Sequence, residues 1–144
     1  MSLSRLLYRS DAALAGSPED VEAQLASLVG ASQAANRAAG LTGALMLASG
    51  TFIQVLEGPI DAVEAAFERI CCDLRHRRVR LLELAAVEER AFAEWSMVQV
   101  PTAGVQGLDP MLASAAAVRL DSPLAGATVE TMRALLRTGG PLTR

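Results

Sequence analysis

Apolar positions in the first hundred residues recur with two different periods, and these periods alternate along the chain. Apolar runs and alternating residues predict β-strands, whereas apolar positions three and four residues apart predict helices. Strands are expected over residues 3–8, 41–48, 51–57, 79–87 and 95–100, and helices over residues 17–39 and 58–74. This order, β-α-β-β-α-β and then a fifth strand, is typical of an α+β ferredoxin-like sandwich.

The local signals for the first helix and the first hairpin are strong. Ser17 and Pro18 combine a capping hydroxyl with a proline at the first helical position, and two acidic residues follow in the first turn. Gly40 stands where the apolar period stops, as expected of a helix C-terminus. Ser49-Gly50 separates two apolar runs and predicts the turn of a hairpin.

The pattern changes after residue 101. Residues 102–110 are loop-like, a short helix is expected over residues 109–118, and a last helix is expected after Thr128. Residues 1–101 carry nine Arg and thirteen acidic residues, whereas residues 102–144 carry four Arg and three acidic residues. We therefore divide the chain into a domain over residues 1–101 and a C-terminal helical extension over residues 102–144. The last helix has an apolar face of Val129, Met132, Leu135 and Leu136, and this face at Val129, Met132 and Leu136 is a candidate contact for a partner.

Composition and charge exclude several classes of function. Hydrophobic residues make up 51% of the chain and aromatic residues 3%, so small and aliphatic side chains dominate the expected core. All thirteen basic residues are arginine, and sixteen acidic residues leave a net charge of −3, which argues against nucleic-acid binding. The uncharged stretch over residues 38–56 is broken by glycines and polar residues, so it predicts two strands and no membrane span. We expect a cytoplasmic protein.

No metal site is expected. Cys71 and Cys72 are neighbours that cannot easily bridge each other, and two thiols with the single histidine, His76, do not make a zinc site. Motifs for phosphate loops, dinucleotide binding and nucleophilic triads are missing from the sequence.

Polar or large side chains occupy four places where the pattern calls for ordinary core residues. Tyr8 points inward from the first strand, Asn36 shares the buried stripe of the first helix, and Gln54 interrupts a strand that is apolar on both faces. Trp95 and Met97 are expected to share one face of the last strand. Each feature alone is explained more often by core packing or by a satisfied backbone group.

Together these features match one family in order and spacing. The chain from about residue 3 to residue 100, two thirds of its length, resembles the BLUF domains, which are flavin-binding blue-light sensors. The matching stretches are Leu6-Leu7-Tyr8-Arg9-Ser10, Ser32-Gln33-Ala34-Ala35-Asn36, Gly40-Leu41-Thr42-Gly43, Phe52-Ile53-Gln54-Val55-Leu56-Glu57-Gly58-Pro59, Asp73-Leu74-Arg75-His76 and Trp95-Ser96-Met97. The resemblance implies the same sandwich fold, with helices appended.

The resemblance also implies a flavin, FAD or alternatively FMN, bound between the two helices. Asn36 would hydrogen-bond the polar edge of the flavin ring, Gln54 would contact the ring, and Tyr8 would bond Gln54. The other implied contacts are Arg69, Asp73, Arg75 and His76 near the ribityl and phosphate part, and Leu25, Leu28 and Ile70 against the ring. Ala35 departs from the family, where many members carry Asn or His.

The implied function is a light switch rather than an enzyme. Light would drive an electron and a proton out of Tyr8, and both would return after Gln54 had changed its orientation or tautomer. Trp95 or Met97 would then move relative to Gln54 and signal to residues 102–144. The output would reach an unidentified protein partner or a second copy of the chain.

Three alternatives belong to other classes of protein. A flavin-free interaction module would have no need for three buried polar side chains, Tyr8, Asn36 and Gln54. A flavin-dependent oxidoreductase would need an open substrate face on its cofactor. An acylphosphatase-like hydrolase would need a glycine-rich cradle after the first strand, which residues 9–12 do not offer.

Overall fold

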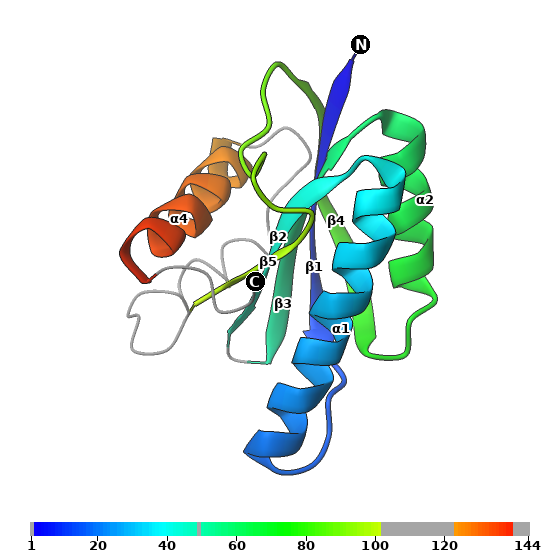
Figure 1. The fold of residues 1–144 in the computed structure, drawn as a ribbon, viewed down its shortest axis with the longest axis vertical. Coiled ribbons are helices and arrows are strands. Elements are labelled where there is room, and N and C mark those ends of the chain that lie inside the picture. The colour runs from blue at the N-terminus through cyan, green and yellow to red at the C-terminus, as the bar shows by residue number, and fades with distance from the viewer. Residues whose placement is uncertain (1, 49, 102–122, 140–144) are drawn as a thin grey trace.

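The computed structural model describes residues 2–48, 50–101 and 123–139 (Figure 1). Its strands are β1 (Leu3–Ala12), β2 (Thr42–Ala48), β3 (Thr51–Gly58), β4 (His76–Val87) and β5 (Val98–Val100), and its helices are α1 (Pro18–Ala39), α2 (Ile60–Cys71) and α4 (Pro123–Gly139). The five strands form one sheet in the order β4-β1-β3-β2-β5. Neighbouring strands are antiparallel except for the parallel pair β2 and β5. This architecture confirms the predicted α+β sandwich with a fifth strand.

The ends of α1 follow from the local sequence, as predicted. The Ser17 hydroxyl accepts a hydrogen bond from the Asp20 backbone N–H at 3.1 Å, and the Asp20 carboxylate accepts one from the Ser17 N–H at 3.0 Å. This reciprocal pair satisfies N–H groups that the first turn leaves without a helical partner. Gly40 ends the helix in the left-handed conformation, with a φ of 74°, which only glycine adopts at little cost.

Other boundaries depend on contacts with distant parts of the chain. β1 continues past its predicted end at Tyr8 because its pairing with β3 extends to Asp11 opposite Thr51. α2 ends before the predicted residue 74, since the Asp73 carboxylate accepts a hydrogen bond from the Arg75 N–H at 2.9 Å and forms a turn there. β4 begins at His76 rather than at residue 79.

The C-terminal predictions were less accurate. The last helix begins at Pro123, earlier than predicted, and β5 begins only at Val98, so Trp95 and Met97 precede it. The short helix expected over residues 109–118 lies outside the described residues. No helix in the described part of the chain is long and apolar enough to cross a membrane.

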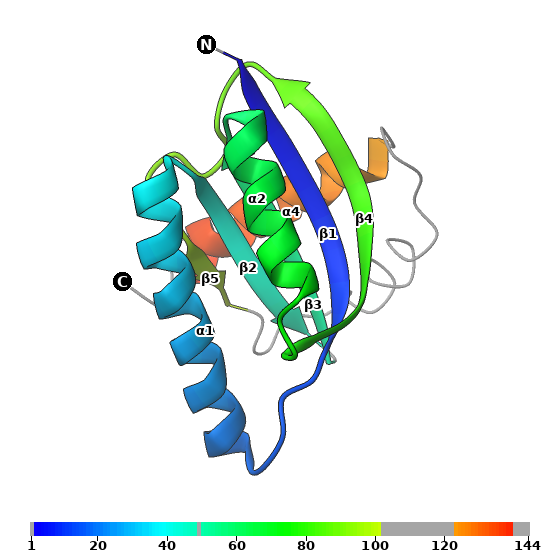
Figure 2. The ribbon, with the colours of Figure 1, turned by 90° about the vertical axis from the view of Figure 1, so that its right-hand side faces the viewer.

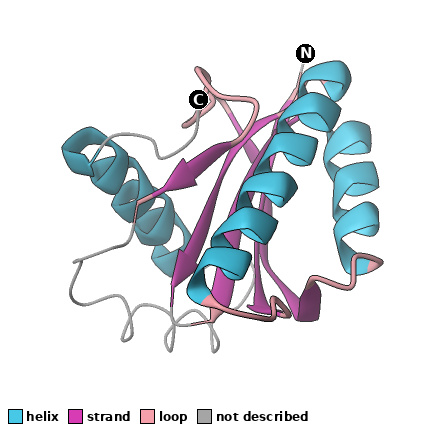
Figure 3. Cartoon of the chain, turned by 60° about the horizontal axis from the view of Figure 1, so that its bottom comes forward, coloured by secondary structure: helices cyan, strands magenta, loops and turns pink. Residues whose placement is uncertain are grey.

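Helices cover both faces of the sheet. Figure 2 shows α1 and α2 in front of the strands and α4 behind them, and Figure 3 shows the same three layers from another side. We call the two sides the α1/α2 face and the α4 face. On the α1/α2 face, Leu6 and Tyr8 of β1 pack with Phe52 and Leu56 of β3 and with the apolar stripes of both helices. The alternation along each strand sends the intervening residues to the α4 face.

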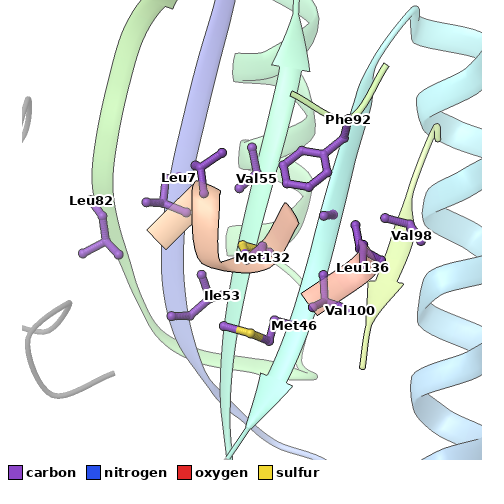
Figure 4. Packing of buried hydrophobic residues seen from close by; sticks show 12 residues of the cluster. Leu7, Met46, Ile53, Val55, Leu82, Phe92, Val98, Val100, Met132 and Leu136 are labelled. Atoms are coloured by element: carbon purple, nitrogen blue, oxygen red, sulfur yellow. The ribbon is translucent and has the colours of Figure 1, made fainter. Parts of the chain in front are cut away.

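The α4 face holds a second apolar core, drawn in Figure 4. Val129, Met132 and Leu136 of α4 are buried there against Ile53, Val55 and other sheet residues, with exposed fractions of 2%, 0% and 7%. The prediction that this helix face is a contact surface for a partner is therefore wrong. The reason is that the sheet has a second apolar face, and α4 covers it.

Candidate functional site

A cavity of about 210 Å³ lies between α1 and α2 on the α1/α2 face. It is lined by Leu28, Ala31, Ser32, Ala35 and Asn36 of α1, Gln54 and Leu56 of β3, Ala66, Arg69 and Ile70 of α2, and Asp73 and Arg75 just after α2. The α1 residues follow a spacing of three and four, so they form one face of that helix. Small side chains on both helices leave the space open.

Tyr8, Gln54 and Met97 form a connected chain of side chains at the floor of this cavity. Tyr8 and Gln54 stand directly opposite each other in the pairing of β1 with β3. The Tyr8 hydroxyl donates a hydrogen bond to Gln54 Oε1, and Gln54 Nε2 donates one to Met97 Sδ at 3.7 Å. All three residues are buried, and only Gln54 also lines the cavity. The amide is thus held between a strong donor and a weak acceptor.

The surroundings of Tyr8 keep its hydroxyl protonated. Burial is the main cause that raises the pKa of Tyr8 well above its ordinary value; the negative charge of Asp73 adds to it, as does Cys71 once its thiol is ionised. The rings of Phe67 and His76 lie 5.6 Å and 5.8 Å from the Tyr8 ring, centre to centre. Tyr8 is therefore a hydrogen-bond donor to Gln54 over the whole physiological pH range.

Two amide side chains of α1 hold the segment that precedes β5. Asn36 Nδ2 donates to the Ser96 carbonyl oxygen at 2.8 Å, and Gln33 Nε2 donates to the Met97 carbonyl oxygen at 3.0 Å. Asn36 is buried and lines the cavity, and its Oδ1 receives no hydrogen bond from the described residues. The cavity wall thus contains a buried acceptor that is available to a ligand.

Charged residues lie where the cavity meets the end of α2. Arg75 forms a two-bonded pair with Asp73, with its Nη2 at 2.7 Å from Oδ2 and its Nε at 3.0 Å from Oδ1. The hydrogen bond from Arg75 lowers the pKa of Asp73, so the carboxyl group is ionised. Arg69 of α2 also lines the cavity and is exposed to solvent. These residues present both signs of charge to a ligand.

Five of the predicted site residues lie outside the cavity wall: Met97, described above, and Tyr8, His76, Leu25 and Trp95. Tyr8 and His76 are next to each other behind Gln54, and the His76 Nδ1 is 2.7 Å from the Ser10 hydroxyl. Burial lowers the pKa of His76. Leu25 belongs to the same apolar layer but does not line the cavity. Trp95 is half-buried on the α4 face.

The prediction that Trp95 and Met97 share one face of a strand is wrong. Both residues precede β5, and the chain crosses from one face of the sheet to the other between them: Trp95 packs with the α4 core and Met97 with the α1/α2 core. Sequence reasoning also did not name Ala31, Ser32 and Ala66 as lining residues. The usable signal for Ala31 and Ser32 was their spacing from Leu28 and Asn36 on one helical face.

The sandwich has a concave site between two helices, with Tyr8 and Gln54 at its floor, which is the kind of site where proteins bind small ligands. The chain belongs to the BLUF family, whose sequence model is described as "Sensors of blue-light using FAD" and matches residues 3–98. This family consists of flavin-binding blue-light sensors, and the finding confirms the resemblance stated above.

Individual relatives agree with this assignment. The photoactivated adenylate cyclase subunit beta of Euglena longa is 40% identical over 63 residues, which are 43% of this chain and 7% of that protein. The photoactivated adenylate cyclase subunit alpha of Euglena gracilis is 38% identical over 68 residues, which are 47% of this chain and 7% of that protein. The chain thus spans only a small part of the length of the curated relatives it matches.

Solved structures are similar over more of their length. The BLUF protein BlrB in its dark state has a TM-score of 0.76 and 29% identity, covering 92% of this chain and 96% of that chain. Klebsiella pneumoniae BlrP1 with FMN and cyclic diGMP has a TM-score of 0.65 and 29% identity, covering 96% of this chain and 35% of that chain. BlsA in its photo-activated state has a TM-score of 0.66 and 28% identity, covering 78% and 77%.

Proposed function

We propose that this chain binds a flavin, FAD or FMN, in the cavity between α1 and α2 and acts as a blue-light receptor without turning over a substrate. The observation that carries the proposal is the position of Gln54. Its amide lies in the cavity wall between the Tyr8 hydroxyl and the Met97 sulfur, in a site where little water competes.

The lining residues fit a flavin. Leu28, Leu56 and Ile70 supply apolar walls for a flat ring, while the Asn36 Oδ1 and the Gln54 amide offer polar contacts at its edge. A bound flavin supplies absorption of blue light and reversible uptake of an electron. The guanidinium groups of Arg69 and Arg75 suit the phosphate of a nucleotide flavin.

Tyr8 and Gln54 supply the switch. Tyr8 is placed to give up an electron and a proton, because its hydroxyl is bonded to the amide that lines the cavity. Reversing the Gln54 amide turns Nε2 toward Tyr8 and Oε1 toward Met97. A thioether has no proton to donate, so the contact with Met97 Sδ is lost in the reversed state. The two orientations therefore differ in how Met97 is held, and light shifts the population between them.

The signal has a short path to the opposite face of the sheet. Met97 is followed directly by β5, whose Val98 and Val100 belong to the core that α4 covers. A movement of Met97 thus shifts β5 and changes the surface against which α4 packs. We infer that β5 and α4 pass the signal to a protein partner or to a second copy of the chain.

The test is the absorption spectrum of the purified protein in the dark and after blue light. We expect a flavin spectrum that shifts slightly to the red and recovers in darkness. Gln54→Leu should abolish the shift, whereas Gln24→Leu, the same substitution near the start of α1 and outside the cavity lining, should leave it intact. No flavin after reconstitution, or a flavin that bleaches while it oxidises a nicotinamide cofactor, would refute the proposal.

A further inference from the structure

A buried carboxylate ties the segment between β4 and β5 to the sheet. Glu57, near the end of β3, has an exposed fraction of 0%. Its Oε1 accepts hydrogen bonds from the Thr42 hydroxyl at 2.9 Å and the Phe92 N–H at 3.0 Å, and its Oε2 accepts one from the Ala91 N–H at 2.5 Å. Ala91 and Phe92 belong to no strand, so Glu57 takes the place of a strand partner for them.

Arg90 strengthens the same connection from the other side. Its Nη1 donates to the Thr42 hydroxyl at 2.9 Å and to the Glu57 carbonyl oxygen at 3.1 Å. Its Nη2 donates to the Gly40 carbonyl oxygen at 3.0 Å. The end of α1, the start of β2 and the end of β3 are thereby joined to residues 90–92.

The segment anchored by Glu57 continues directly to the proposed switch. Three residues after Phe92, the Trp95 carbonyl oxygen accepts from the Gly43 N–H at 3.1 Å, and the chain then passes to the α1/α2 face. Met97 meets Gln54 there. The position of Met97 relative to Gln54 is therefore fixed at both ends of a short segment, by Glu57 on one face and by α1 on the other.

A carboxylate suits this anchor for a specific reason. Among the described residues, the groups that hydrogen-bond to the Glu57 side chain are all donors, namely two backbone N–H groups and a hydroxyl. A carboxylate accepts on both oxygens, whereas an amide would turn an NH₂ group toward one of these donors. A buried acid is costly unless its hydrogen bonds are made, so packing alone does not explain its presence.

We propose that Glu57 is a positioning residue for the light switch: its carboxylate holds residues 90–97 so that Met97 stands against Gln54 in the dark state. This inference rests on the proposed function for its consequence in light. The anchor itself is independent of flavin and has its own readout.

The first experiment compares Glu57→Gln with Glu83→Gln. Glu83 is also a buried carboxylate of this sheet, but its hydrogen bonds come from Arg5, at 2.7 Å and 3.1 Å, and not from residues 90–97. In Glu57→Gln we expect amide hydrogen exchange at Ala91 and Phe92 to quicken by about tenfold or more. Glu83→Gln should leave exchange at both amides unchanged.

Trp95 gives a second readout, because it is the single tryptophan of the chain and lies in the anchored segment. Its fluorescence should be quenched more strongly by acrylamide in Glu57→Gln than in Glu83→Gln. Should Glu57→Gln fail to fold, Thr42→Val removes only the hydroxyl that links Glu57 to Arg90, and the same changes are expected at a smaller size. Equal exchange and quenching in the variants of the anchor and in the control would overturn the proposal.

The third readout is the dark recovery of the flavin-loaded protein. Glu57→Gln leaves Tyr8 and Gln54 untouched, so the red shift should form with its ordinary size. Recovery should be at least about twofold slower, because in a loosened segment Met97 lies against Gln54 for a smaller fraction of the time. Unchanged recovery with a loosened segment would show that Glu57 is only structural. If the wild-type chain showed no light-induced shift, the proposed function would be refuted instead. The exchange data would still show whether Glu57 anchors residues 90–97.

Discussion

Replacing Met132 by alanine tests whether α4 is part of the folded core or an attachment to it. Met132 has an exposed fraction of 0% and lies among Leu7, Ile53 and Val55 of the sheet, as Figure 4 shows. The substitution removes three heavy atoms from a fully buried position. It leaves space that the rigid strands beneath it fill poorly.

The expected loss follows from that burial. Truncation of a buried methionine costs about 2–5 kcal/mol of unfolding free energy, and the better helix propensity of alanine returns only a few tenths. For a chain of this size, each kcal/mol lowers the unfolding temperature by about 2–4 °C. The Met132→Ala variant should therefore unfold about 4–20 °C below the wild type.

Thermal unfolding followed by far-UV circular dichroism measures this shift, with Glu130→Ala as the control. Glu130 is exposed on the same helix, and its loss should change the unfolding free energy by less than about 0.5 kcal/mol. The flavin spectrum of Met132→Ala should be unchanged at low temperature, since α4 and the cavity lie on opposite faces of the sheet. Equal unfolding temperatures for the two variants would refute the packing of α4 against the sheet.

Three further predictions concern the α1/α2 face. Tyr8→Phe leaves Gln54 Oε1 without its donor, so it should abolish the light-induced red shift and lower the free energy of unfolding, measured in urea, by about 1–3 kcal/mol. A red shift of wild-type size would contradict this. Ala35→Leu should prevent flavin binding by filling the cavity, whereas Ala34→Leu, one position away and outside the lining, should not; equal flavin content in both would argue against this cavity. Burial lowers the pKa of His76 below 6.5, so its neutral form favours the folded state: stability should be full above about pH 6.5 and fall as the pH drops below it. Replacing this histidine by asparagine should flatten that part of the curve, and an unchanged slope would show that another group titrates.

The local sequence accounts for much of the fold. The capping residues around Ser17 and the glycine at position 40 set both ends of α1, because their hydrogen bonds and backbone conformations involve only neighbouring residues. Alternation along β1 and β3 placed Tyr8 and Gln54 on the buried face for the same local reason. Which residue of β3 lies opposite Tyr8 is a matter of register, which depends on the whole sheet.

The sequence by itself therefore determined the order of elements, the ends of α1 and the burial of Tyr8, Asn36 and Gln54, since each of these depends on periodicity and short-range chemistry. Only the tertiary structure decided what α4 covers and how Trp95 and Met97 divide between the two faces. The apolar stripe of an amphipathic helix predicts that one side is buried, but it does not identify the surface against which that side packs. The segment before the crossing is hydrogen-bonded to Glu57, a residue more than thirty positions earlier, and these hydrogen bonds form only when the sheet has assembled.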